Sequence, residues 1–341
     1  MQRREFITLL GGAAAAWPLA ARAQQPERIR RVGILMGGAS ADASESQASI
    51  AAFVQGLQQL GWTEDRNLKI DSLWAVGNSD NARDYAAELA ALAPALAALA
   101  PEVILTNGTG TMAPMLRATR TVPIVFVNVT DPVGAGFDEN LARSDRNATG
   151  FTNFQYGIAS KWLDLLKEIS PGVTRVAVLR DPAITAGLGQ WDAIQAVAPA
   201  LGVEAIPANL GDASEIDRAF AAFARSADGG SNSGLIVTTS ASATVHRKLI
   251  VTLAARHKLP AVYSRRLFVT DGGLISYGTD LIDQFRLAAG YVDRILKGEK
   301  PGDLPVQRPS KYELVVNLKA ASALGIGVPA TVLDRAHEVV G

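Results

Sequence analysis

Short apolar runs alternate with amphipathic stretches along most of the chain. Residues 31–36 form a short run that is apolar after Arg31 and is followed by Gly37 and Gly38, as in a buried parallel strand. Residues 44–60 then place their apolar side chains on one helical face, and Gly61 ends the helix. The same alternation predicts strands over residues 68–74, 102–106, 123–127, 175–179, 203–208, 234–238, 261–263 and 273–276, and helices over residues 81–99, 110–120, 158–169, 188–200, 213–226, 243–257 and 281–297.

This order of strands and helices predicts an α/β fold, in which parallel sheets are covered by helices on both faces. The length of 341 residues fits two such sheets better than one. Ligands of these folds bind beyond the carboxyl ends of the strands, where the backbone N–H groups of helix starts favour anions. Candidate ligand-binding residues are therefore expected at the strand ends.

The residues at these ends are mostly small, hydroxylic or amidic, and few carry a charge. They are Gly38, Ser40, Asn107, Gly108, Thr109, Asn128, Thr130, Asp131, Ser240, Ser242, Tyr263 and Tyr277. Loops of this kind suit hydrogen bonding to a small polar ligand. Gly108 and Gly110 would let the backbone approach a carboxylate closely. Each position also has an alternative role, because the same residue types form ordinary helix caps and turns.

The first 23 residues predict an export signal. Arg3 and Arg4 precede an uncharged apolar stretch, and residues 21–23 (Ala-Arg-Ala) fit the pattern for signal peptidase. The apolar stretch has about 16 residues, fewer than the ~20 of a permanent membrane helix. The paired arginines favour a twin-arginine signal over a general secretory one. We expect cleavage after Ala23 and a mature protein in the periplasm.

Composition narrows the classes of function. The 33 basic and 33 acidic residues balance, which gives no basic surface for nucleic acid. The chain has no cysteine and only three histidines, which disfavours a thiol catalyst or a metal centre. It also lacks the G-x-S-x-G, H-E-x-x-H and phosphate-loop motifs. We expect a protein that is not an enzyme and uses no metal or cofactor.

Several stretches resemble one family, the ABC transporter substrate-binding proteins that include tryptophan- and tyrosine-binding members. The matching stretches are residues 122–136, 171–179, 253–263, 272–278, 289–298, 304–307 and 314–319. They span nearly all of the mature chain in the order found in the family. The resemblance implies the type I periplasmic binding-protein fold, in which two α/β lobes with parallel sheets are joined by three crossing strands and clamp a ligand between them.

The resemblance also implies the extent of the lobes and additional site residues. Lobe one would comprise residues 28–152 and 277–303, and lobe two residues 153–276 and 304–341. Asp181 would face the ligand from lobe two. Phe154 or Tyr156, at the first crossing, would stack on a planar ligand or pack in the hinge. A ligand carboxylate would meet residues 107–109, and an ammonium group would meet an acid such as Asp131 or Asp280.

The function that this family implies is capture without chemical conversion. The protein would be a monomer and the periplasmic solute-binding component of an ABC importer. Its ligand would be an amino acid, aromatic ones included, or a related carboxylate. Ligand binding would shift the lobes toward a closed form that is recognised by an inner-membrane permease with its ATPase. The alternative is a ligand-sensing periplasmic module for a membrane receptor kinase. A repressor domain of the same fold is disfavoured, because an export signal stands where DNA-binding helices would be.

Overall fold

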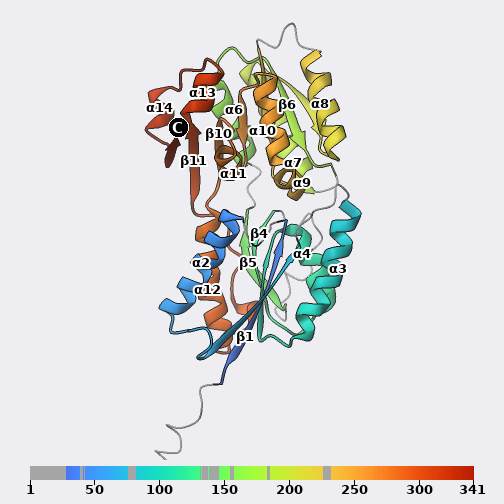
Figure 1. The fold of residues 1–341 in the computed structure, drawn as a ribbon, viewed down its shortest axis with the longest axis vertical. Helices are drawn as coiled ribbons and strands as arrows, with labels where there is room; N and C mark the ends of the chain where they lie inside the picture. The colour runs from blue at the N-terminus through green and yellow to red at the C-terminus, as the bar shows by residue number, and fades with distance from the viewer. Residues whose placement is uncertain are drawn as a thin grey trace, which may run out of the picture.

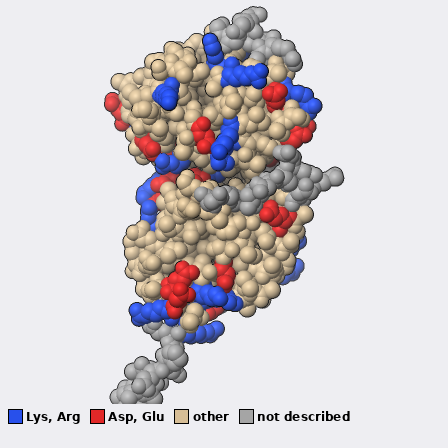
Figure 2. All heavy atoms as spheres, viewed as in Figure 1, with Lys and Arg blue, Asp and Glu red and all other residues tan. Residues whose placement is uncertain are grey.

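The computed structural model describes residues 28–38, 41, 43–75, 82–130, 132, 137, 146–153, 157–182, 185–225 and 232–341. These residues form two lobes, each built around its own sheet of mostly parallel strands (Figure 1). The predicted α/β class with two sheets is therefore confirmed. Figure 2 shows a constriction between the lobes, with basic and acidic side chains next to each other at one side of it.

Lobe one contains the five-stranded sheet, in the order β2-β1-β3-β4-β5, with parallel pairing throughout. Its strands are β1 (Arg30–Gly37), β2 (Leu68–Ala75), β3 (Val103–Asn107), β4 (Ile124–Val129) and β5 (Ala148–Thr152). Its helices are α2 (Ser44–Gln59), α3 (Ala82–Ala98), α4 (Thr109–Ala118) and, from much later in the chain, α12 (Leu281–Leu296).

Both faces of this sheet are buried, which explains the continuous apolar runs in its strands. Val32 and Ile34 of β1 pack with Phe53 of α2 and Phe285 of α12 in one core cluster. Leu35 of β1 points to the opposite cluster, which α3 and α4 cover. Alternate residues of the same strand thus serve two cores.

Lobe two contains a seven-stranded sheet in the order β12-β11-β10-β9-β8-β6-β7. Its strands are β6 (Arg175–Arg180), β7 (Glu204–Asn209), β8 (Ser233–Val237), β9 (Ala261–Tyr263), β10 (Ile275–Thr279), β11 (Tyr312–Asn317) and β12 (Glu338–Val340), and β11 runs antiparallel to β10. Its helices are α6 (Gly157–Ile169), α7 (Thr185–Val197), α8 (Ala213–Arg225), α9 (Ala241–Val245), α10 (Arg247–Arg256), α11 (Arg266–Thr270), α13 (Leu318–Ala323) and α14 (Ala330–Leu333). A short 3-10 helix lies at Pro199–Leu201 in this lobe, and another lies at Pro301–Asp303 in lobe one.

The chain passes between the sheets three times, after β5, after β10 and before β11. Leu304 lies in the core of lobe one. Gln307 extends β5, because its N–H donates to Gly150 O (2.8 Å) and its carbonyl accepts from Thr152 N (2.9 Å). The second crossing therefore follows Thr279 and the third follows Gln307.

Most predicted elements coincide with observed ones, and the differences are local. The helix expected over residues 243–257 is two helices, α9 and α10, which meet at His246. The helix α3 runs through Pro94 without ending there. Strands β5, β11 and β12 were not predicted. No helix within the described part of the chain has the length and hydrophobicity that crossing a bilayer requires.

Candidate functional site

The strand ends of lobe one are tied to one another by hydrogen bonds. Asn107 Nδ2 donates to Gly37 O (3.3 Å), so the ends of β1 and β3 are joined. Thr109 Oγ1 accepts from Thr130 N (2.9 Å) and donates to Thr130 O (3.3 Å), which joins the start of α4 to the end of β4. The structure thus brings together the predicted site residues of these three strand ends. Their side-chain donors are largely occupied by other parts of the same lobe.

Gly108 needs to be glycine for a conformational reason. It is the residue before α4, with φ +91° and ψ 150°, in a region that L side chains rarely adopt. Gly38, at φ +68°, is in the left-handed region as well, and it lies opposite Ala241 of lobe two. A Cβ placed on Gly38 would be 3.6 Å from the Ala241 Cβ, so the two lobes are close to contact at this point.

In lobe two, the predicted hydroxyls act mainly as helix caps. Ser240 Oγ accepts from Ala243 N (2.9 Å) at the start of α9, and Ser242 lies inside that helix. Asp181 follows β6 and is half-buried. Asp280 caps the start of α12, where its Oδ1 accepts from Asp283 N (3.0 Å). The capping alternative is the role observed for Ser240 and Asp280.

The structure buries Tyr263 in a packed core, whereas Tyr277 is half-buried at the edge of one. Tyr263 is 1% exposed and stacks on Phe268, with ring centroids 4.9 Å apart. Burial raises the pKa of its hydroxyl, which therefore stays neutral. Tyr277 stacks on Tyr312 at 5.8 Å and packs against the core cluster around Trp162. Four further predicted residues, Ser40, Asp131, Phe154 and Tyr156, lie outside the described residues.

A pocket lies between the lobes, at the strand ends of both sheets. It encloses about 370 Å³ of space, including the part open to solvent. Its lining residues are Asn128 and Asn153 at the end of lobe one, Ile158 and Trp162 of α6, Gln190 of α7, Thr239, Ser264 and Arg265 after strands of lobe two, and Gly278, Thr279 and Leu281 at the second crossing. Of the predicted site residues that the structure describes, Asn128 is the one that lines this pocket.

Sequence reasoning missed Trp162 and Gln190 because both lie within helices. Trp162 is 1% exposed, and its indole N–H donates to Tyr277 O (2.7 Å), so its sequence signal is that of a core residue. Gln190 Oε1 accepts from Thr239 N (3.0 Å) and fixes that strand end. Ser264 and Arg265 carried a usable signal, since both directly follow the predicted strand 261–263.

A buried polar network holds the first two crossings together. Gln284 of α12, which is 4% exposed, accepts from Asn128 N (2.8 Å) and donates to Asn153 Oδ1 (2.8 Å) and Thr152 O (3.3 Å). Asn153 Nδ2 in turn donates to Asn128 Oδ1. Asn128 has φ +57°, an uncommon value for a residue other than glycine, and this network holds it there.

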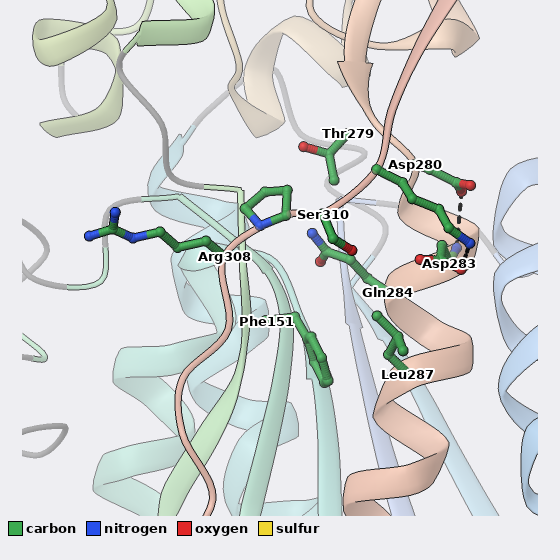
Figure 3. A pocket seen from close by; sticks show the side chains of 10 residues that line it. Phe151, Thr279, Asp280, Asp283, Gln284, Leu287, Arg308 and Ser310 are labelled. Atoms are coloured by element: carbon green, nitrogen blue, oxygen red, sulfur yellow. Dashed lines mark hydrogen bonds and ion pairs between the residues drawn. The ribbon is translucent and has the colours of Figure 1, made fainter. Parts of the chain in front are cut away.

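A second, smaller hollow lies on the outer side of this network (Figure 3). Phe151 of β5 and Leu287 of α12 form its apolar side, whereas Arg308 points away from it. Lys311 Nζ donates to Asp283 Oδ1 (2.8 Å) and so ties the third crossing to α12. This hollow is part of the hinge and shares Thr279, at the end of β10, with the interlobe pocket.

An ion pair connects the two lobes directly. Arg265 Nη2 of lobe two donates to Glu45 Oε2 of α2 in lobe one at 2.5 Å, and Arg265 Nη1 donates to Thr244 Oγ1 at 3.3 Å. The Arg265 and Glu45 side chains are 19% and 22% exposed. An ion pair shielded to this degree is stronger than one on an open surface. It therefore favours the closed arrangement of the lobes.

Glu313 of β11 lies near charges from both lobes. Arg266 Nη1 donates to Glu313 Oε2 at 3.0 Å, and Arg266 also contacts Glu338. Burial, with repulsion from Asp280 and Glu45, raises the pKa of Glu313 from 4.5 to about 7, against the attraction of Arg266. Between pH 4.5 and about 7, Glu313 therefore gains a proton when the chain folds.

The variant Glu313→Gln tests this shift. Between pH 4.5 and about 7 the unfolded chain has lost a proton that the folded chain keeps, so the contribution of Glu313 to stability falls as the pH rises. We expect the free energy of unfolding of the wild type, relative to the variant, to fall by about 2–3 kcal/mol over this interval and then level off. Urea unfolding of both proteins across this range measures the difference. A constant or rising difference would contradict the raised pKa.

The described residues contain no group of three or more His, Asp or Glu side chains placed to hold a metal ion. The polar groups at the pocket are amides, hydroxyls and one guanidinium. They can bind a small polar ligand through hydrogen bonds, and Trp162 and Ile158 supply an apolar wall.

Comparisons with known proteins agree with the two-sheet α/β fold. The sequence model of a family described as ABC transporter substrate binding protein matches residues 41–340. A tyrosine-binding protein from Clostridioides difficile (strain R20291) is 24% identical over 272 residues, which cover 80% of this chain and 75% of that protein.

Solved structures share the fold over nearly the whole chain. A conserved domain protein from Vibrio cholerae is 26% identical, with a TM-score of 0.79, and the match covers 92% of this chain and 100% of that one. An ABC domain from Streptococcus pneumoniae in complex with L-Trp is 23% identical, with a TM-score of 0.79 and the same coverage. A ligand-free, open substrate-binding protein with adhesive properties from Clostridium difficile is 21% identical, with a TM-score of 0.67, and covers 92% of this chain and 99% of that one.

Proposed function

The chain belongs to the ABC transporter substrate-binding protein family, and we propose that it captures an amino acid in the pocket between its lobes and delivers it to an importer. The observation that carries this proposal is that the pocket is lined by residues of both lobes and of the crossings. A ligand held there gains its full set of contacts only when the lobes are closed. Binding therefore shifts the hinge equilibrium toward the closed form.

The ligand class follows from the pocket lining together with the relatives. Trp162 and Ile158 offer an apolar wall to a side chain, whereas Asn128, Asn153 and Arg265 offer polar groups to a backbone-like head. The relatives that support an aromatic amino acid are the tyrosine-binding protein and the complex with L-Trp. A related aromatic carboxylate would present the same apolar group and the same anion.

The setting of this function is the periplasm. Cleavage after Ala23 would release a monomer that carries the ligand to an inner-membrane permease, and the ATPase of the transporter would hydrolyse ATP. Ligand capture and release need no bond to be made or broken, so the substrate-binding protein has no catalytic residues in this proposal.

Thermal unfolding of the mature chain with single amino acids tests the proposal. A ligand at one hundred times its dissociation constant stabilises the folded state by about 2.7 kcal/mol, which raises the melting temperature by several degrees. We expect such a shift with L-tryptophan, L-tyrosine or L-phenylalanine, and none with L-lysine as the matched control. The recovered ligand should have an unchanged mass. If no amino acid shifts the melting temperature, or if the ligand is recovered altered, the proposal is wrong.

A further inference from the structure

We propose that Ser264 and Arg265, directly after β9, form the subsite for the ligand's carboxylate, and that Glu45 of the opposite lobe positions the Arg265 guanidinium. This inference rests on the proposed function, since it assumes a ligand with a free carboxylate. It differs from the expectation drawn from the sequence, which placed that group at residues 107–109.

The charge of the pocket lining supports this subsite. Arg265 is the one formally charged side chain among the described residues that line the pocket, and the others are amides, hydroxyls or apolar groups. An arginine offers five N–H donors in a planar fork that matches a carboxylate. Its described contacts use one N–H of Nη2 toward Glu45 and one of Nη1 toward Thr244, which leaves three N–H groups, that of Nε included, for a ligand.

The neighbouring Ser264 supplies a second donor. It is 5% exposed and lines the same pocket, and its Oγ has no hydrogen-bond partner within the described structure. Buried hydroxyls nearly always have a partner, so an unpaired one in a pocket wall indicates a group that a ligand completes. A carboxylate oxygen accepts from both a hydroxyl and a guanidinium.

The start of α4 is less suited to this role. Thr109 Oγ1 is already bonded to Thr130, and Asn107 Nδ2 to Gly37 O. None of residues 107–109 is among the residues that line the interlobe pocket. Asn107 does have an unpaired buried Oδ1, but this atom is an acceptor and would repel a carboxylate.

Glu45 acts on this subsite through Arg265. The ion pair restricts a long side chain that would otherwise have many rotamers, and it does so only when the lobes are closed. A ligand carboxylate on the remaining donors of Arg265 is thereby coupled to the contact between the lobes. Glu45 is a positioning residue in this arrangement and does not itself contact the carboxylate.

The test compares L-tryptophan with L-tryptophanamide, which lacks the carboxylate, by calorimetry on the mature chain. The wild type should prefer L-tryptophan by at least about tenfold. Arg265→Gln should weaken L-tryptophan binding by about 10–100-fold and change amide binding by less than about threefold, so the preference disappears. Ser264→Ala should reduce the same preference to a smaller extent. Arg256→Gln, at an exposed arginine at the end of α10, is the matched control and should change neither affinity.

The variant Glu45→Gln separates positioning from direct contact. It should weaken L-tryptophan binding in the wild-type background and have no further effect on the preference in Arg265→Gln. If Arg265→Gln keeps the wild-type preference, or loses both ligands equally while its melting temperature is unchanged, the subsite is wrong and the proposed function stands. If the wild type binds neither L-tryptophan nor any other amino acid in the thermal screen, both proposals fail.

Discussion

Replacement of Gly150 by alanine is expected to prevent lobe one from reaching its native structure. Gly150 lies in β5 with φ +150°, a value that L side chains rarely adopt. A Cβ at this position would lie 2.0 Å from Phe126 O and 2.6 Å from Phe126 N, both backbone atoms of the neighbouring strand β4. Because backbone atoms of a central strand cannot move aside, we expect a loss of more than about 4 kcal/mol in the free energy of unfolding. Circular dichroism with urea unfolding measures it.

Gly290→Ala is the matched control for this substitution. Gly290 lies within α12, and no heavy atom lies within 4 Å of the Cβ position, so the added methyl group meets open space. Alanine is the better helix former, and we expect a gain of about 0.5–1 kcal/mol. A Gly150→Ala protein that unfolds at the same urea concentration as the wild type would show that β5 does not pair with β4 as described.

Replacement of Gln284 by leucine is expected to destabilise the hinge and weaken ligand binding together. Leucine fills a similar volume but leaves Asn128 N–H and Asn153 Oδ1 without their buried partner. Unpaired buried polar groups cost about 1–3 kcal/mol each, so we expect a loss of about 3–5 kcal/mol in the free energy of unfolding. Since Asn128 and Asn153 also line the interlobe pocket, the affinity for the amino acid should fall as well.

The control for this substitution is Gln58→Leu, at an exposed position near the end of α2. It should change the free energy of unfolding by less than about 0.5 kcal/mol and leave ligand affinity unchanged. Urea unfolding and calorimetry on both variants make the comparison. If Gln284→Leu is as stable as Gln58→Leu, the polar network does not hold the hinge.

The sequence predicted strands with continuous apolar runs, such as β3, and also partly exposed ones, such as β2 and β7. Strand β5 was not predicted because its sequence, Ala-Thr-Gly-Phe-Thr, contains a glycine and is typical of a turn. That glycine is required by the close approach of Phe126, a tertiary contact that no local pattern contains. Strand β12 is three residues long and mostly exposed, so it has no hydrophobic signal.

The candidate site was predicted less completely than the fold. Strand ends could be located from the sequence, and Asn128 was identified in this way. Which strand-end side chains face the pocket depends on how one lobe is oriented against the other, and that orientation is set by contacts such as Glu45 with Arg265. Tyr263 shows the same difficulty, because an aromatic residue at the end of a buried strand has the same pattern whether it faces a ligand or a core.

The position of α12 has a consequence for the timing of biosynthesis. Phe285 and Leu304 complete the hydrophobic core that α2 and β1 begin, and they leave the ribosome about 250 to 270 residues after β1. A nascent chain that ends before residue 281 thus lacks the part of the core around Phe53 and Leu57 that α12 supplies. The N-terminal lobe therefore completes its folding late in translation, and chaperones that recognise exposed apolar segments have most of the elongation period in which to bind it.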